Sequence, residues 1–455
     1  MTIDIDIGAA CHITVTGNNG PPLETLNIKF SRDNLGELRR NVRNRLRKFA
    51  FDLAAPISTK DPRVSLRDGI RALRELHDFG YLLLRTLIGE KDRPKLPELI
   101  KMTRTACTGN AAADSWPGPR WSELSPRPNL VVFKTQVEDG IPIDILPLLN
   151  EDLDGLEAFD EFEQLGQLAS CFLGFSAIVK RDIGKAIGVA PRLENVPQLP
   201  IKLFINRGLR GARQEEVNFR TNENIDVAPG GWPNDHSVPQ NGFAKKLAEH
   251  LLEGNTRFGA GPRQLADQIC HFACHSDTSE GLSSIDYEIG LQSRQLIGRR
   301  KVNIEKLTVA LDKLRAKRGG GGGPGPLIFM NSCGSGDLDP RGAASFPDLF
   351  LDETLGFMGF IGTETVMPDQ FAAEFSRVFY KHLIRGVEIG DTVLLTRWEL
   401  LKTYRNPLGL MYTIFAEPEI RVMRPVEEPA MQQTPSSGIL AGIGRFFGFQ
   451  GRAVV

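Results

Sequence analysis

Short apolar runs that alternate with helical patterns constrain the fold of this 455-residue chain most strongly. Six such runs predict strands, at residues 129–135, 201–206, 268–274, 326–331, 356–363 and 411–416. Segments with apolar residues at helical spacing lie between or after them, at residues 241–254, 303–318, 369–386 and 391–404. This alternation indicates βαβ units, and it predicts an α/β fold with a mostly parallel sheet covered by helices on both faces.

The first part of the chain has a different pattern. Residues 1–30 alternate in hydropathy around GNNGPP, which predicts a β-hairpin, and residues 33–54 and 65–89 predict a pair of helices. A segment rich in Gly, Pro, Ser and Asp follows. We therefore expect an accessory or sensor domain over residues 1–110, a linker over 111–128, an α/β domain over 129–428, and an amphipathic, Gly-rich tail over 429–455.

Composition excludes several classes of protein. Hydrophobic residues make up 41% of the chain and charged residues 24%, which is typical of a globular protein. The 55 basic and 56 acidic residues nearly cancel, so no global field favours nucleic acid as a partner. Six basic residues crowd the first predicted helix without interleaved aromatic residues, which favours a solvated face: Arg39, Arg40, Arg43, Arg45, Arg47 and Lys48.

Cysteine usage indicates the compartment. The six cysteines are thinly spread, which fits a reducing cytoplasm better than a disulfide framework. We expect no signal peptide and no membrane-spanning helix, because no basic segment precedes an apolar run and no uncharged apolar stretch approaches the required length. The polyglycine segment 319–326 lacks the Gly-Lys-Ser/Thr ending of a phosphate-binding loop, and we expect no cofactor.

The stretch CHFACH, residues 270–275, gathers two cysteines and two histidines in six residues. In a strand these side chains alternate, so His271 and His275 face one side of the sheet, and Cys270 and Cys274 face the other. A zinc site needs about four converging ligands. We therefore expect no metal site, and we expect Cys270, Cys274 and Cys171 to be buried apolar residues, with His271 packed within the sheet.

Two reactive side chains end neighbouring predicted strands. His275 follows QICHFAC and Cys333 follows PLIFMN, where α/β proteins usually build their sites. If the two strands are adjacent, the His275 imidazole lies near the Cys333 thiol. The imidazole can then deprotonate the thiol to a nucleophilic thiolate. Glycines after Cys333 leave backbone N–H groups open to hold an oxyanion.

These blocks resemble a known family. CHFACHSD, LIFMNSCGSGD and LGFMGFIGTETVMPDQFAAEFSRVFYKHL are similar to the His block, the Cys block and the following strand and helix of CHAT-domain peptidases, in the caspase, gingipain and separase group. PNLVVFKTQVEDGIPIDILPLL resembles the leading hairpin of that family. The resemblance covers residues 128–425 and implies a caspase-like sheet.

The resemblance also implies roles for single residues. His275 would be the general base and Cys333 the nucleophile, with backbone N–H groups of Ser276, Cys333 and Gly334 as oxyanion donors. The family usually has Gly at Ser276, and a Ser there is unfavourable if the site needs positive φ. Asp369 lies where related peptidases have an acidic residue at the pocket for a basic P1 side chain, but it is an equally good helix N-cap. Asp337 and Glu364 are further candidates for substrate specificity.

We therefore expect a regulated intracellular cysteine endopeptidase that cleaves partner proteins, with a regulatory or sensor partner. The alternative is a noncatalytic adaptor that retains the peptidase fold. A zinc-binding α/β protein is a third hypothesis. The tail, with its apolar face at Ile439–Phe447, is either a segment that contacts a membrane or a partner or a tail packed on the body.

Overall fold

The structure is a computed structural model. It describes residues 2–5, 11–16, 22–28, 35–54, 61–88, 90–108, 130–134, 142–148, 161–183, 192–193, 198–227, 230–233, 242–252, 257–258, 264–265, 267–280, 285–294, 298–318, 325–333, 335–336 and 345–423. In parts of these ranges only the backbone is described, and this includes His275. The expected linker at 111–128 and the tail at 429–455 lie outside the described residues.

A six-stranded sheet forms the centre of the α/β part. Its order is β17-β16-β15-β11-β7-β8, and all neighbours are parallel except β16 and β17. The strands are β7 (Leu199–Ile205), β8 (Ile225–Asp226), β11 (Ile269–Ala273), β15 (Leu327–Asn331), β16 (Gly359–Thr363) and β17 (Tyr412–Ala416). The predicted fold class, with a mostly parallel sheet, is confirmed, and five of the six predicted strands belong to this sheet.

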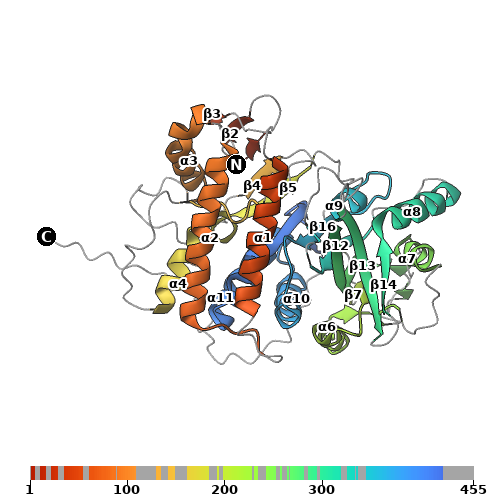
Figure 1. Cartoon of the computed structure of the whole chain (residues 1–455). Helices are drawn as coiled ribbons and strands as arrows, with labels where there is room; N and C mark the ends of the chain where they lie inside the picture. The colour runs from red at the N-terminus through yellow and green to blue at the C-terminus, as the bar shows by residue number, and fades with distance from the viewer. Residues whose placement is uncertain are drawn as a thin grey trace.

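Helices cover both faces of this sheet (Figure 1). One side carries α6 (Arg210–Arg220), α10 (Asp369–Leu383) and α11 (Ile389–Tyr404), and the other carries α7 (Phe243–Leu252), α8 (Ile304–Arg318) and α9 (Phe346–Phe350). Alternate residues of each strand therefore enter two different hydrophobic clusters. In β11, Ile269 and Ala273 belong to the first cluster and Cys270 and Phe272 to the second, as strand geometry requires.

A second sheet joins the beginning of the chain to residues far along it. Its order is β3-β2-β1-β4-β5, with β1 (Thr2–Ile5), β2 (Cys11–Thr16), β3 (Pro22–Ile28), β4 (Leu130–Lys134) and β5 (Ile178–Asp182). The predicted N-terminal hairpin is thus β2 and β3 of a larger sheet. The leading hairpin implied by the resemblance is not found in the described residues, because β4 pairs in parallel with β1 and β5, and Pro147 in residues 142–148 bridges to Phe172 instead.

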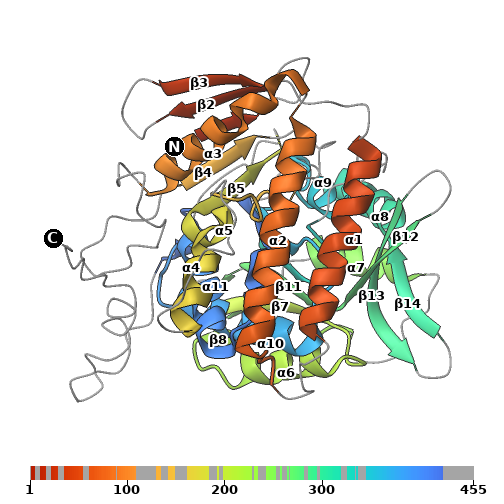
Figure 2. The same cartoon turned by 60° about the vertical axis from the view of Figure 1, so that its left-hand side comes forward.

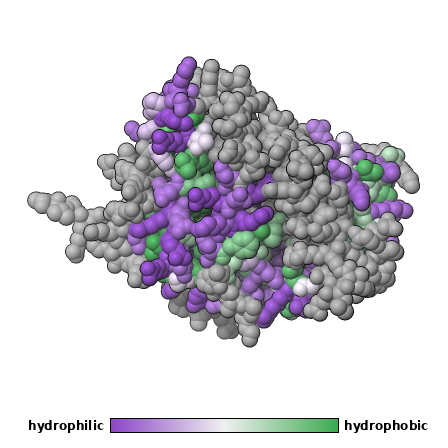
Figure 3. Space-filling view, viewed as in Figure 1, coloured by the Kyte–Doolittle hydropathy of each residue, from purple (hydrophilic) through white to green (hydrophobic). Residues whose placement is uncertain are grey.

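The predicted helical pair is α1 (Leu35–Ala54) and α2 (Leu66–Leu87), which run side by side across the molecule (Figure 2). Ser65 caps α2, since its hydroxyl accepts a hydrogen bond from the Asp68 backbone N–H at 3.1 Å. The outward faces of both helices are largely hydrophilic (Figure 3), as the solvated-face interpretation of α1 predicts. Their inward faces join the same hydrophobic cluster as the central sheet, so α1 and α2 share one core with the rest. A separate role for residues 1–110 stays a prediction.

Smaller elements complete the described chain. A three-stranded antiparallel sheet, β12 (His275–Glu280), β13 (Ile285–Arg294) and β14 (Gly298–Asn303), lies between β11 and α8 along the chain. The others are η1 (Glu90–Lys95), α3 (Leu96–Thr108), α4 (Glu161–Ser170), α5 (Leu173–Ser176), β6 (Arg192–Leu193), β9 (Arg257–Phe258), β10 (Gln264–Leu265), η5 (Pro407–Met411) and β18 (Arg421–Val422). Among the described helices, none has the length and hydropathy that crossing a bilayer requires.

Candidate active site

The carboxyl ends of β7, β11 and β15 form one edge of the central sheet. In sequence order the six strands take the positions 2-1-3-4-5-6, so the chain direction across the sheet reverses between β7 and β11. Open α/β sheets bind ligands in the crevice at such a reversal, outside the carboxyl ends of the strands. Both predicted catalytic residues follow strands that end at this edge.

The backbone register relates these two residues. Ala273 at the end of β11 pairs with Asn331 at the end of β15, so the predicted adjacency of the strands is confirmed. His275 lies two residues beyond Ala273, and Cys333 lies two residues beyond Asn331. His275 is also the first residue of β12, where its Cα is opposite Gly290. The His275 side chain lies outside the described part of the structure.

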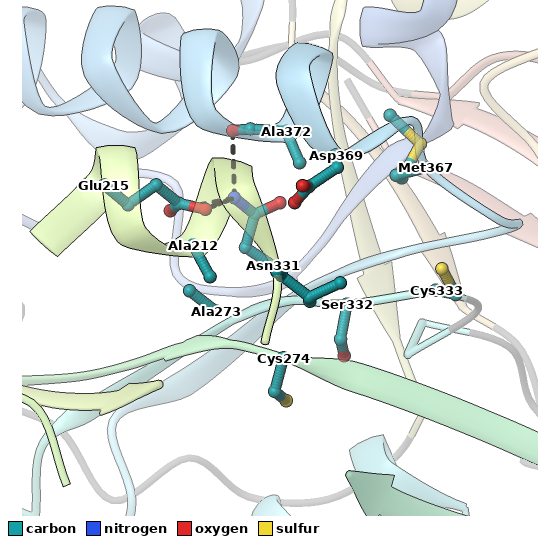
Figure 4. A pocket seen from close by; sticks show the side chains of 11 residues that line it. Ala212, Glu215, Ala273, Cys274, Asn331, Ser332, Cys333, Met367, Asp369 and Ala372 are labelled. Carbon is teal, nitrogen blue, oxygen red and sulfur yellow. Dashed lines mark hydrogen bonds between the residues drawn. The ribbon is translucent and has the colours of Figure 1, made fainter. Parts of the chain in front are cut away.

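A small cavity opens at this edge. Its volume is about 70 Å³. The lining comes from the ends of β11 and β15, from α6 and from the start of α10 (Figure 4). Its lining residues are Leu209, Ala212, Glu215, Ala273, Cys274, Asn331, Ser332, Cys333, Met367, Asp369 and Ala372. Cys333 points toward the side where Met367 and Asp369 lie, whereas Cys274 points the opposite way (Figure 4).

Cys333 differs from the other cysteines whose side chains the structure describes. Cys171, Cys270 and Cys274 are buried, as the sequence predicts, and Cys333 is partly exposed. Burial raises the pKa of each of the three buried thiols above its ordinary value. A thiol reacts as the thiolate, so within this group Cys333 is the side chain best placed to act as a nucleophile.

The turn that carries Cys333 is fastened to the end of β16. Thr363 Oγ1 donates to the Ser332 carbonyl oxygen at 2.5 Å, and Thr363 N donates to Ser335 Oγ at 3.0 Å. The Gly336 N–H donates to the Thr363 carbonyl oxygen at 2.8 Å. One residue of β16 thus holds the turn on both sides of Cys333.

A buried polar network lies beneath the cavity. The Glu215 carboxyl oxygen Oε2 lies 2.7 Å from His271 Nε2 and accepts a hydrogen bond from Asn331 Nδ2 at 3.0 Å. Asn331 Nδ2 also donates to the Ala372 carbonyl oxygen at 2.9 Å, and Tyr412 Oη donates to Asn331 Oδ1 at 2.6 Å. Each polar atom of the Asn331 amide is therefore used, which fixes the residue two positions before Cys333.

His271 belongs to this network and not to the predicted catalytic pair. Its ring is fully buried, with Nδ1 3.1 Å from Tyr380 Oη and stacking on Phe329. Cys270 and Cys274 lie on the other side of the sheet. CHFACH is thus divided between two faces, and in the described ranges no three His, Cys, Asp or Glu side chains converge as metal ligands would.

Asp369 lines the cavity and also contacts a neighbouring helix. It is the first residue of α10, whose N-cap is Pro368, and its Oδ2 accepts a hydrogen bond from the Gly211 N–H at 2.7 Å. The side chain therefore satisfies a free N–H at the start of α6, a different helix from the one that its sequence position indicates. Gly211 is required there, because an added Cβ would lie 2.2 Å from the Asp369 carbonyl oxygen.

The other specificity candidates are Glu364 and Asp337. Glu364 is buried, its Oε1 lies 2.8 Å from Arg181 Nη2 on β5, and it is not among the described residues that line the cavity. A role for it in specificity stays a prediction. Asp337 and Gly334 lie outside the described residues. Ser276 is described only in its backbone, in β12 opposite Ile289.

Sequence reasoning missed the acidic side chain at the cavity floor. Glu215 lies in RGARQEEVNFR, where it is one of several charged residues on a helix with few apolar residues. No local pattern distinguishes Glu215 from Glu216, which binds Arg207 and Arg220 instead. Asn331 could have been found, because it ends a strand of apolar residues just before the Cys block.

Comparison with known proteins gives weak likenesses. No protein-family profile matches the chain. A probable protease of Vitiosangium sp. (strain GDMCC 1.1324) is 37% identical over 94 residues, which are 20% of this chain and 12% of the length of that protein. A solved structure described as a protease has a TM-score of 0.37 and 8% identity, covering 71% of this chain and 68% of its own. The Saccharomyces cerevisiae separase–securin complex has a TM-score of 0.34 and 10% identity, covering 87% of this chain and 23% of the other.

Proposed function

We propose that this protein is a cysteine peptidase in which His275 and Cys333 form a catalytic pair. The observation that carries the proposal is the register of β11 and β15, since Ala273 pairs with Asn331 and each catalytic residue lies two positions further on. Adjacent strands lie about 4.8 Å apart. The resemblance of the His and Cys blocks to CHAT-domain peptidases and the match to a probable protease support the same reaction class.

In this mechanism the Cys333 thiol loses its proton to the His275 imidazole, and Sγ attacks the carbonyl carbon of the scissile peptide bond. The backbone N–H groups of Ser276 and Cys333 are the proposed donors to the oxyanion. His275 returns the proton to the leaving amine as the C–N bond breaks, which leaves a thioester on Cys333. Water, deprotonated by His275, then hydrolyses the thioester and restores the thiol.

The cavity favours a basic side chain in the residue before the cleaved bond. Asp369 and Glu215 place two carboxyl groups on its lining, and no Lys, Arg or His is among the described residues that line it. Cys333 lines the same cavity. A guanidinium or ammonium group there would gain charge-assisted hydrogen bonds, so we propose Arg or Lys at this position of the substrate.

The proposed substrates are partner proteins, with residues 1–110 recruiting them or a regulatory partner. Cleavage of a proteome-derived peptide library, read by mass spectrometry, tests the proposal. We expect cleavage after basic residues by the intact chain and none by Cys333→Ala or His275→Ala. Cys270→Ala is the matched control, because it removes a buried thiol of β11 that does not line the cavity. A folded chain that cleaves no peptide and resists a thiol-reactive probe at Cys333 would fit the noncatalytic adaptor instead.

A further inference from the structure

A buried ion pair connects the two large sheets of the molecule. Arg181 lies in β5 of the five-stranded sheet, and Glu364 follows the last residue of β16 in the central sheet. Arg181 Nη2 is 2.8 Å from Glu364 Oε1, and the two side chains are 1% and 4% exposed. The guanidinium also lies over the Phe415 ring of β17, 5.6 Å from its centroid. Water therefore has little access to screen the pair.

Glu364 is adjacent in sequence to Thr363, the residue that holds the Cys333 turn. Thr363 bonds Ser332, Ser335 and Gly336. The Glu364 N–H donates in turn to the Met411 carbonyl oxygen at 2.8 Å. The backbone at the end of β16 is thus fixed from one side by Arg181 and from the other by the turn.

β16 and the Cys333 turn are closely packed against each other. A Cβ added to Gly362 would lie 2.8 Å from Gly336 N and 2.9 Å from Ser335 Oγ. A Cβ added to Gly336 would lie 2.5 Å from Thr413 Cγ2. Because protein interiors are close-packed and transmit strain, a displacement of Glu364 must move Thr363 and the turn with it.

We propose that Arg181 and Glu364 are positioning residues, which set the place of the Cys333 turn and couple the sheet containing the N-terminal strands to it. This inference rests on the proposed function of Cys333. The strand pairing gives the coupling a route, because β5 pairs with β4 and β4 pairs with β1. The first strand of the chain is thereby connected through Arg181 to the candidate nucleophile.

The test must separate positioning from loss of stability. Removing one partner of a buried ion pair leaves an uncompensated charge, whereas replacing both partners by uncharged residues of similar volume is often tolerated. The informative variant is therefore the double substitution Arg181→Met/Glu364→Gln. Lys202→Met/Asp267→Asn is the matched control, since it replaces both partners of another buried pair, Lys202–Asp267 (3.6 Å), away from the Cys333 turn.

Two readouts are compared at a temperature where all chains are folded. Hydrogen exchange of the Gly336 amide reports the turn directly, because this amide donates to Thr363. For the double variant we expect at least about tenfold faster exchange at Gly336 and a fall of similar size in kcat with KM nearly unchanged. The control Lys202→Met/Asp267→Asn should change neither. Wild-type exchange at Gly336 in the folded double variant overturns the inference. An intact chain without peptidase activity would overturn the proposed function instead, and exchange would still decide the coupling.

Discussion

Ala273 and Asn331 are the last paired residues of β11 and β15, and they lie side by side at the edge where both strands end. The chain leaves the sheet after each of them, toward β12 on one side and the Cys333 turn on the other. Asn331 is fixed by hydrogen bonds to Glu215, Ala372 and Tyr412. The strand end that precedes Cys333 is therefore held in place by side-chain hydrogen bonds as well as by the sheet.

The cysteines of the folded protein should differ in the rate at which they are alkylated. At pH 7 we expect iodoacetamide to modify Cys333 faster than Cys171, Cys270 or Cys274, because those three are buried and burial raises the pKa of their thiols. Peptide mass spectrometry after a short pulse gives the order. Equal modification of Cys274 and Cys333 in the folded chain would contradict the described burial.

The contact between α6 and α10 should not tolerate a methyl group. Gly211→Ala places a Cβ 2.2 Å from the Asp369 carbonyl oxygen, so we expect the free energy of unfolding to fall by about 1–3 kcal/mol. Urea unfolding measures it. Gly242→Ala is the control, because a Cβ there meets nothing within 4 Å. Equal stability of the two variants would show that α6 and α10 are less closely packed.

Removing the Asn331 side-chain amide should lower the free energy of unfolding. Asn331→Ala leaves Glu215, Tyr412 and the Ala372 carbonyl each without one buried partner. Since a buried polar group without its partner costs about 1–3 kcal/mol, we expect a loss of at least about 2 kcal/mol. Asn218→Ala removes a hydrogen bond between Gln214 and Asn218 at the surface and should change stability by less than about 0.5 kcal/mol. Thermal and urea unfolding should agree on this order.

Stability should depend on the ionisation of Glu399. Burial alone would raise the pKa of this carboxyl group, but hydrogen bonds from His382 and Lys381 outweigh it and lower the pKa from 4.5 to about 2. A carboxyl group whose pKa is lower in the folded state stabilises the fold above its unfolded pKa. Its contribution should be present above pH 4.5 and be lost as the pH falls toward 2.

Glu399→Gln isolates this contribution. The variant should be less stable than the intact chain at pH 6, and the difference should shrink between pH 4.5 and 2. Urea unfolding midpoints at several pH values give the comparison. A difference that stays constant down to pH 2 would mean that Glu399 does not titrate with a lowered pKa.

The sequence allowed five of the six strands of the central sheet to be predicted because each is a short, wholly buried run, whereas β8 has only two residues and was not predicted. β7, β11, β15 and β17 are buried at every position. The alternation in CHFACH also placed Cys270 and His271 correctly, on opposite sides of the sheet. These features depend on local composition and on the two-residue period of a strand.

Long-range pairings were beyond prediction. β1 pairs with β4 although more than a hundred residues separate them, and nothing in either segment specifies that partner. The ion pair between Glu364 and Arg181 could not be predicted either, because the two residues are remote in sequence. The β12–β14 sheet was missed because its strands are polar, and sequence alternation there is weak.

The rate at which iodoacetamide alkylates Cys333 at pH 7, in the intact chain and in His275→Ala, tests the catalytic pair most directly. A cysteine with an ordinary pKa of about 8.5 is only about 3% thiolate at that pH. If His275 accepts the proton of Cys333, the intact chain should react at least about tenfold faster than the variant. Equal rates in two folded proteins would contradict the pair and the peptidase mechanism built on it.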